Sequence, residues 1–343
     1  MTSGLRRKFN QSPALRIYGI TALVSILAIG WVGVEFGIAA LITTVILAVL
    51  EISLSFDNAV VNAKVLKNMS PAWQKAFLTV GILIAVVGVR VVLPVVLVAI
   101  FAHLGIGEVV HLIMNDPAQY GEILHHIHPE IAAFGGIFLL MLFLDYIFGT
   151  REVLWLHRLE QPLARVGQLE RLEVVVAILA LIAATSFAGS EHTASMLMSG
   201  LAGLALYLGI KAFGNYFEGR DMAKNAAQAG LAGFLYLEVL DASFSLDGVL
   251  GAFAITSNIV IIIVGLGIGA LWVRSMTIHL VQTDTLMRYR YLEHGAHYAI
   301  GVLAVLLLVS ASKEISEIIT GLVGLCIIAA ALADSVRANR KST

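Results

Sequence analysis

The sequence predicts an all-α polytopic membrane protein of about ten transmembrane helices, arranged as two inverted five-helix repeats with both termini in the cytoplasm. Three observations predict this fold. The 343 residues are 59% hydrophobic and only 13% charged, and their mean hydropathy is +0.90. Long apolar segments recur along the chain, and one polar motif occurs twice inside them. Such a composition is far from that of a soluble domain, so most of the chain must lie in lipid.

Ten segments are long and apolar enough to span the hydrocarbon core, which requires about 20 mostly apolar residues. They are residues 15–34, 38–62, 76–101, 131–149, 172–188, 194–213, 230–256, 258–281, 295–312 and 314–334. Residues 1–14 and 335–343 form the predicted terminal tails. The basic N-terminal segment leads into an apolar run without a small-residue cleavage site, so we expect the first helix to be retained.

The distribution of basic residues predicts the orientation, because short cytoplasmic loops accumulate Lys and Arg. With a cytoplasmic N-terminus, the cytoplasmic loops and tails receive all of the basic residues except Arg90, Arg274 and Lys313. Residues 102–130 contain four acidic and five histidine side chains but no Lys or Arg. We therefore expect this segment to be a partly amphipathic, acidic external loop.

The internal repeat consists of Glu51-Ile-Ser-Leu-Ser-Phe-Asp57-Asn58 and Asp241-Ala-Ser-Phe-Ser-Leu-Asp247-Gly248. In each half, the following helix carries one arginine, Arg90 or Arg274. The two copies lie five spans apart and therefore cross the membrane in opposite directions. The predicted repeats are residues 15–188 and 189–334. Inverted repeats are typical of secondary transporters, whose substrate sites lie near the midplane where the repeats meet.

Five carboxylic acids are predicted to lie deep in the membrane, where a carboxylate costs several kcal/mol by insertion scales. They are Glu51, Asp57, Glu238, Asp241 and Asp247. One interpretation is that they only pair with Arg90 and Arg274 and fix helix packing, together with the motif serines. The acids outnumber the arginines, however, and bound protons or metal cations would compensate the excess.

The residues around these acids supply oxygen ligands, which suit hard ions such as Mn²⁺, Mg²⁺ or Ca²⁺. Candidate ligands are Glu51, Asp57, Asn58, Asp241 and Asp247, and candidate supporting residues are Ser55, Asn62, Arg90, Glu238, Ser245 and Arg274. On a helical wheel, Glu51, Ser55, Asn58 and Asn62 share one face, and Asp57 lies about 120° away. Convergence on one ion therefore predicts a bend or an unwound turn at the motif, near Asn58 or Gly248.

The two motifs resemble those of the TerC family of integral membrane proteins. The resemblance rests on Glu51-x-x-Leu54-Ser55-x-Asp57-Asn58 and on Asp241-x-x-Phe244-Ser245-Leu246-Asp247, followed by Ala252-Phe253-Ala254-Ile255-Thr256. It covers residues 40–310. It implies export of manganese ions, a link to tellurium resistance, kinship with the LysE exporter superfamily, and the five candidate ligands as a metal site. Gly248 departs from the small polar residue common in the family, so the chain resembles a divergent branch.

These features predict a secondary transporter in the bacterial inner membrane that exports a divalent cation, with Mn²⁺ as the first candidate. Two alternatives stay open: a LysE-like exporter of an organic cation or amino acid, and a non-transport scaffold linked to metal stress. We expect no enzymatic activity, since no nucleophile and base, nucleotide-binding or metalloprotease signature occurs. The expected partners are the lipid bilayer and the metal cation, with no cofactor and no nucleic acid. A homo-oligomer or secretion and stress partners also stay open.

Overall fold

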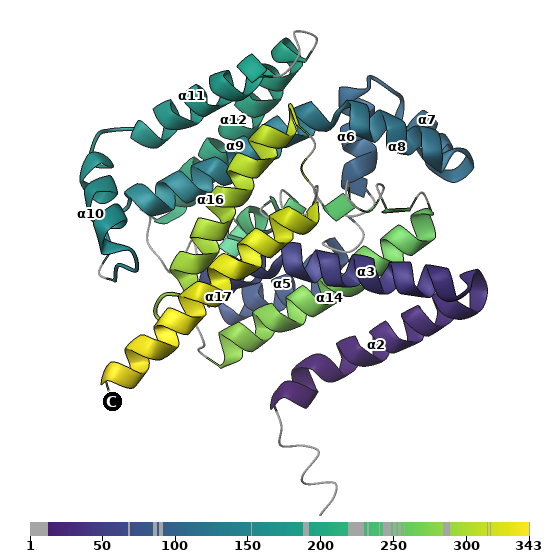
Figure 1. Cartoon of the computed structure of the whole chain (residues 1–343), viewed down its shortest axis with the longest axis horizontal. Helices are drawn as coiled ribbons and strands as arrows, with labels where there is room; N and C mark the ends of the chain where they lie inside the picture. The colour runs from purple at the N-terminus through teal and green to yellow at the C-terminus, as the bar shows by residue number, and fades with distance from the viewer. Residues whose placement is uncertain are drawn as a thin grey trace, which may run out of the picture.

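The computed structural model describes residues 13–67, 69–84, 88, 92–151, 153–187, 192–218, 230–231, 233–239, 241–242, 248–249, 252, 255–256, 258–283, 289–313, 315 and 317–342. This part of the chain is mostly helical and contains no strand (Figure 1). Its helices are α2 (Pro13–Phe36), α3 (Ile38–Leu54), α4 (Phe56–Lys67), α5 (Pro71–Leu83), α6 (Leu93–Phe101), α7 (Ile106–Asn115), α8 (Pro117–His126), α9 (His128–Phe148), α10 (His157–Val166), α11 (Leu172–Phe187), α12 (Thr193–Glu218), α14 (Ile259–Gln282), α16 (Leu292–Ser310) and α17 (Glu317–Ser342).

Within the described residues, six helices contain a segment long and apolar enough to cross a membrane. These segments are Ile17–Phe36, His128–Phe148, Thr193–Ala212, Ile259–Gln282, Leu292–Ser310 and Leu322–Arg340. The pair α3 and α4 gives a seventh if a bent helix counts as one span. The predicted helical, multi-pass architecture is therefore consistent with the structure.

The other three expected spans correspond to shorter or partly described segments. Residues 172–188 correspond to α11, which is apolar but has only 16 residues. Residues 76–101 include the end of α5 and all of α6, with several positions between them outside the described part, and residues 230–256 are described only at some positions. The count of ten spans stays a prediction.

Side-chain contacts give the relative directions of the helices. The start of α9 meets the start of α12 through Glu130 and Ser195, and their ends meet through Asp145 and Lys211, so the two helices are parallel. The start of α9 meets the end of α16, where His128 lies 3.4 Å from Ser310, so this pair is antiparallel. The contacts of α2 with α14 also run in opposite directions.

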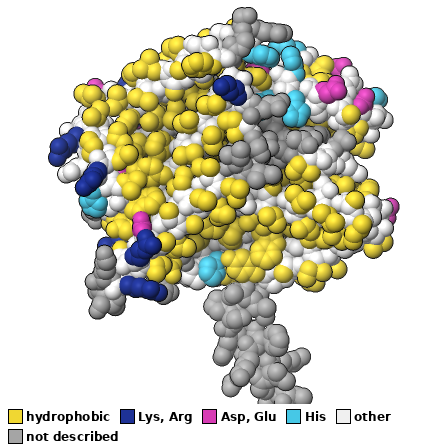
Figure 2. Space-filling view, in the orientation of Figure 1, with side chains coloured by type: hydrophobic (Ala, Val, Ile, Leu, Met, Phe, Trp, Pro, Cys, Tyr) yellow, Lys and Arg dark blue, Asp and Glu magenta, His cyan; other side chains and the backbone are white. Residues whose placement is uncertain are grey.

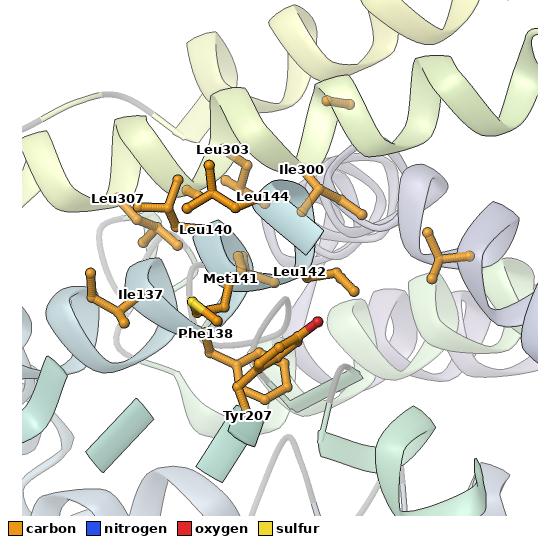
Figure 3. Close-up of a cluster of buried hydrophobic side chains, with 14 of the residues drawn as sticks. Ile137, Phe138, Leu140, Met141, Leu142, Leu144, Tyr207, Ile300, Leu303 and Leu307 are labelled. Atoms are coloured by element: carbon orange, nitrogen blue, oxygen red, sulfur yellow. The ribbon is translucent and has the colours of Figure 1, made fainter. Parts of the chain in front are cut away.

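The largest hydrophobic cluster lies between α9 and α16, with α11, α12 and α4 around it. In Figure 3, Ile137, Phe138 and Met141 of α9 lie between Tyr207 of α12 and side chains of α16. Phe138 and Tyr207 stack edge to face, with ring centroids 5.6 Å apart. Because α9 is apolar on all sides and mostly buried, it forms the centre of this half of the molecule.

The segment expected to be a partly amphipathic, acidic external loop, residues 102–130, is mainly helical. It contains α7 and α8, and α9 begins at His128. The break between α7 and α8 has a local cause: Asp116 caps α8 by accepting a bond from Gln119 N, and Pro117 occupies the first turn. The acidic segment thus forms a pair of short helices that lie at one end of the molecule (Figure 1).

The outer surface carries many large apolar side chains, as expected for helices that face lipid. They include Ile20, Val34 and Ile38, which are 74%, 88% and 73% exposed. Cys326 of α17 is exposed too. Figure 2 shows a broad hydrophobic surface across one face of the molecule. Such a continuous surface is typical of contact with a membrane.

Candidate cation site among the membrane helices

The first polar motif lies where the second predicted span breaks into α3 and α4. Leu54 ends α3, Ser55 has φ −105° and ψ 13°, and Phe56 begins α4. The axes of Ile38–Leu54 and Asn58–Lys67 differ by 54°. The break therefore lies at Ser55, one turn before Asn58, where the sequence had suggested a bend. Ser55 Oγ donates to Glu51 Oε1 at 3.0 Å across the break.

The predicted polar face of this span is buried. Glu51 is 0% exposed, and Ser55, Asn58 and Asn62 are each 2% exposed. Asp57 belongs to α4, but its side chain lies outside the described part of the structure. A face of one carboxylate, one hydroxyl and two amides inside the bundle requires polar partners, because burying such groups without hydrogen bonds is costly.

Asp241 of the second motif supplies a partner for both amides. Its side chain is 9% exposed, and Oδ1 accepts hydrogen bonds from Asn58 Nδ2 and from Asn62 Nδ2, the latter at 3.2 Å. The two asparagines lie one helical turn apart on α4, which is the spacing that lets both reach one atom. The structure thus brings the two motifs together at this carboxylate.

Glu51 lies on the other side of this crossing, against two glycines of the second half. A Cβ atom at Gly248 would lie 2.6 Å from Glu51 Oε2. A Cβ atom at Gly269 of α14 would lie 2.5 Å from both Cβ and Cγ of Glu51. Only residues without a side chain permit these approaches, so both glycines make room for the buried carboxyl group.

Glu238 and Arg274 form a further buried polar group near the same crossing. The two side chains are 8% and 6% exposed, and both lie against Gly81 of α5, where a Cβ atom would be 2.5 Å from Glu238 Oε1 and 2.6 Å from Arg274 Nη2. The Arg274 guanidinium covers the ring of Phe77, with Cζ 3.6 Å from the centroid. It is also within electrostatic reach of Asp241. The face of the Phe77 ring is therefore already in contact with a cation of the protein, the Arg274 guanidinium.

Of the predicted site residues, Glu51, Ser55, Asn58, Asn62, Glu238, Asp241 and Arg274 are described and lie in this polar region. Arg90, Ser245 and Asp247 lie outside the described residues, as does the side chain of Asp57. Among the residues that the structure describes, no group of three or more His, Cys, Asp and Glu is arranged to hold a metal ion.

Sequence reasoning missed two features of this region. Gly269 was not singled out, although Gly265-Leu-Gly-Ile-Gly269 has the small-x-x-x-small spacing that permits close helix packing. Gly265 lies against Leu47 and Gly269 against Glu51, so this spacing seats α14 on α3. Glu160 was also missed. It is 1% exposed and accepts bonds from Trp155 N, Leu156 N and Tyr298 Oη.

The long apolar helices and the polar crossing inside them are consistent with a multi-pass helical membrane protein with a buried polar centre. A family model described as "Protein of unknown function (DUF475)" matches residues 56–342. The chain belongs to this family. No curated protein and no solved structure matches the chain. The resemblance to the TerC family stays a prediction.

Proposed function

We propose that the protein is a secondary transporter that exports a divalent cation, with Mn²⁺ as the first candidate, across the bacterial inner membrane. Asp57 and Asp241 are the proposed primary ligands, and Glu51, Asp247 and Asn58 complete the site. The observation that carries the proposal is the meeting of the two motifs, where Asn58 and Asn62 contact Asp241 inside a bundle of apolar helices. A buried carboxylate at such a place is a feature of ion pathways in membrane proteins.

The contacts around the crossing support an inverted repeat. Asn58 and Gly248 occupy the same position in the two motifs, and so do Glu51 and Asp241. Asn58 contacts Asp241, and Gly248 lies against Glu51, so each contact is the symmetry equivalent of the other. Motif helices that pass each other in opposite directions would make these two contacts, and an inverted repeat requires that arrangement.

The helix directions support an alternating ten-span topology. The parallel pair α9 and α12 corresponds to the fourth and sixth expected spans, and the antiparallel pair α9 and α16 to the fourth and ninth. In Figure 2, most Lys and Arg side chains of the face shown gather at the left end, near α10 and the end of α17, and several Asp, Glu and His side chains lie at the upper right, near α7 and α8. This polarity fits a cytoplasmic C-terminus.

The chemistry of the crossing fits a hard cation. Carboxylate oxygens of Glu51 and Asp241 and amide oxygens of Asn58 and Asn62 are the ligand types that Mn²⁺, Mg²⁺ and Ca²⁺ take. An amide that donates to Asp241 presents its oxygen instead after a half turn about its last bond, so the same asparagines can stabilise the carboxylate and coordinate an ion. Arg274, beside Glu238 and Asp241, supplies positive charge close to the site.

The test is Mn²⁺ uptake into inside-out vesicles by the Asp241→Asn variant. Asparagine keeps an oxygen acceptor for Asn58 and Asn62 but removes the charge, so the fold is retained. Loss of a direct ligand should lower the transport rate at least about tenfold. The matched control is Asp116→Asn, because Asp116 is exposed, lies on the acidic segment and only caps α8.

Normal Mn²⁺ transport by Asp241→Asn would rule out this site. Transport of an amino acid or organic cation by the wild-type vesicles, without Mn²⁺ transport, would favour the LysE-like alternative. If no solute moves and only deletion of the loops changes a metal-stress phenotype, the scaffold alternative is correct.

A further inference from the structure

The short helix α10 lies between two apolar helices and has three distinct faces. It follows α9, which ends at Phe148, and precedes α11, which begins at Leu172. In Figure 1 it lies across the end of the bundle, at the left, away from α7 and α8. Its position at the end of two membrane-type helices is where an interfacial helix would lie.

The inner face of α10 is fixed to the bundle. Glu160 accepts bonds from Trp155 N at 3.2 Å and from Leu156 N at 3.1 Å, which closes the first turn. The Tyr298 hydroxyl donates to the same carboxylate at 3.2 Å, and Trp155 Nε1 donates to Asp334 Oδ2 of α17 at 3.0 Å. These bonds hold the helix to α16 and α17 in one orientation.

A second face is apolar and exposed. Leu159 and Val166 are 45% and 47% exposed, and Pro162 between them is exposed too. At 100° per residue these three side chains fall within about 60° of one another, on a side that Glu160 does not occupy. Leu156 and Leu169, which flank the helix, are 41% and 61% exposed. The apolar surface thus continues past both ends of α10.

A third, basic face borders the apolar one. Arg158 and Arg165 are exposed, and their spacing of two helical turns puts them about 20° apart on the wheel. Both lie next to Pro162 and almost opposite Glu160. Gln161 is exposed beyond them, on the side away from Leu159. Around the helix the order is therefore apolar, basic and polar, which is the order of acyl chains, headgroups and water in a membrane.

From this order we propose that α10 lies in the headgroup region of the cytoplasmic leaflet and binds anionic phospholipid through Arg158 and Arg165. Leu159, Pro162 and Val166 enter the acyl region, and each arginine meets a phosphate. The occupant is lipid because the apolar face continues the lipid-facing surface of the adjoining helices and its charge is complementary to an anionic leaflet. The inference does not depend on the proposed transport activity.

α7 provides an internal comparison for this inference. Ile106, Val110 and Met114 form an exposed apolar face, 61%, 45% and 74% exposed, on the same kind of short helix. Glu108, His111 and Asn115 form its polar side, and α7 contains no Lys or Arg. We expect α7 to contact lipid without preference for anionic headgroups, so the preference belongs to the arginines of α10.

The first experiment measures the depth of α10 in a membrane. The full chain with Cys326→Ser, and with Leu159→Cys or Gln161→Cys, carries a spin label in vesicles of equal phosphatidylcholine and phosphatidylglycerol. The label at 159 should collide mainly with oxygen, which dissolves in lipid, and the label at 161 mainly with a water-soluble nickel complex. Access of the nickel complex to both labels would place α10 in water and overturn the proposal. Protection of position 159 from both reagents would indicate a protein partner and also overturn it.

The second experiment measures headgroup preference as the association of spin-labelled phosphatidylglycerol relative to phosphatidylcholine. Arg158→Gln with Arg165→Gln should lower this ratio about fivefold for each arginine removed, since a basic residue near an anionic surface contributes about 1 kcal/mol. The control, Arg337→Gln with Arg340→Gln, removes the same charge from exposed positions near the end of α17. An equal decrease in the control, or none in the α10 variant, would contradict the proposal.

Discussion

The two halves of the polar crossing stabilise their acids by different means. Glu51, from the first half, receives a hydroxyl bond from Ser55 at the break after its own helix and fits against Gly248 and Gly269. Asp241, from the second half, receives two amide bonds from the opposite motif, and Arg274 lies near it. Equivalent positions of the two motifs, Asn58 and Gly248, thus provide an amide donor on one side and a glycine on the other. The two motifs therefore contribute unequal chemistry to the crossing.

The largest effect on stability is expected from replacing Arg274, which supplies positive charge at the crossing. Arg274→Met leaves Glu238 and Asp241 buried without the nearby guanidinium, and an uncompensated buried charge costs about 3–5 kcal/mol. The double variant Glu238→Gln with Arg274→Met removes both charges and should regain most of that stability. Both effects are measured as the free energy of unfolding of the purified variants in mixed micelles.

Lys64→Met is the matched control for this comparison. Lys64 pairs with Glu293 at the end of α4, and these side chains are 44% and 30% exposed. Its loss should cost less than about 1 kcal/mol, because solvent screens the pair. If the double variant is as unstable as Arg274→Met, the arginine acts by packing on Phe77 and its charge is unimportant.

A smaller effect should follow from exchanging the unequal residues of the two motifs. Asn58→Gly removes a donor to Asp241 together with a proposed oxygen ligand and should weaken Mn²⁺ affinity at least about tenfold. Adding Gly248→Asn supplies an amide beside Glu51, whose carboxyl group must move away from the new Cβ, and should restore much of the affinity if the halves are equivalent. Mn²⁺-dependent thermal stabilisation of the purified protein gives the affinities.

The control for the exchange is Asn58→Gly combined with Gly209→Asn. Gly209 lies in α12 with no atom within 4 Å of an added Cβ, so asparagine fits there but supplies nothing to the crossing. Recovery in both double variants would show that the effect of Gly248→Asn is unspecific. Recovery in neither would show that Glu51 and Asp241 are not equivalent.

The sequence predicts which residues form the buried polar face, but it does not predict how this face is arranged in space. The spacing of Glu51, Ser55, Asn58 and Asn62 identifies one helix face, and the structure buries all four. The sequence did not predict that the helix breaks at Ser55. The motif also contains Ser53, and the sequence does not indicate which of the two serines lies at the break. The two helices of residues 102–130 were not predicted from the sequence, because the boundary between them depends on a local cap, Asp116.

Contacts between distant segments were the least predictable. The motif repeat identifies Asp241 as a partner position, but the two-asparagine contact depends on the crossing angle of helices far apart in sequence. Glycines show the same limitation, because only the packed structure shows that Glu238 and Arg274 both lie against Gly81. Residue types predict which groups need partners, whereas packing decides which partners they receive.

The smallest effect should come from the first half alone, at Ser55. Ser55→Ala removes the bond to Glu51 at the break and should destabilise the protein by about 1 kcal/mol, the typical net value of one hydrogen bond. Ser53→Ala is the control, since Ser53 bonds only to Val49 O of its own helix and should change stability by less than about 0.5 kcal/mol. If the two substitutions destabilise the protein equally, the hydroxyl of Ser55 only supports the local helix turn. The two amide donors to Asp241 would then distinguish the second half more clearly from the first.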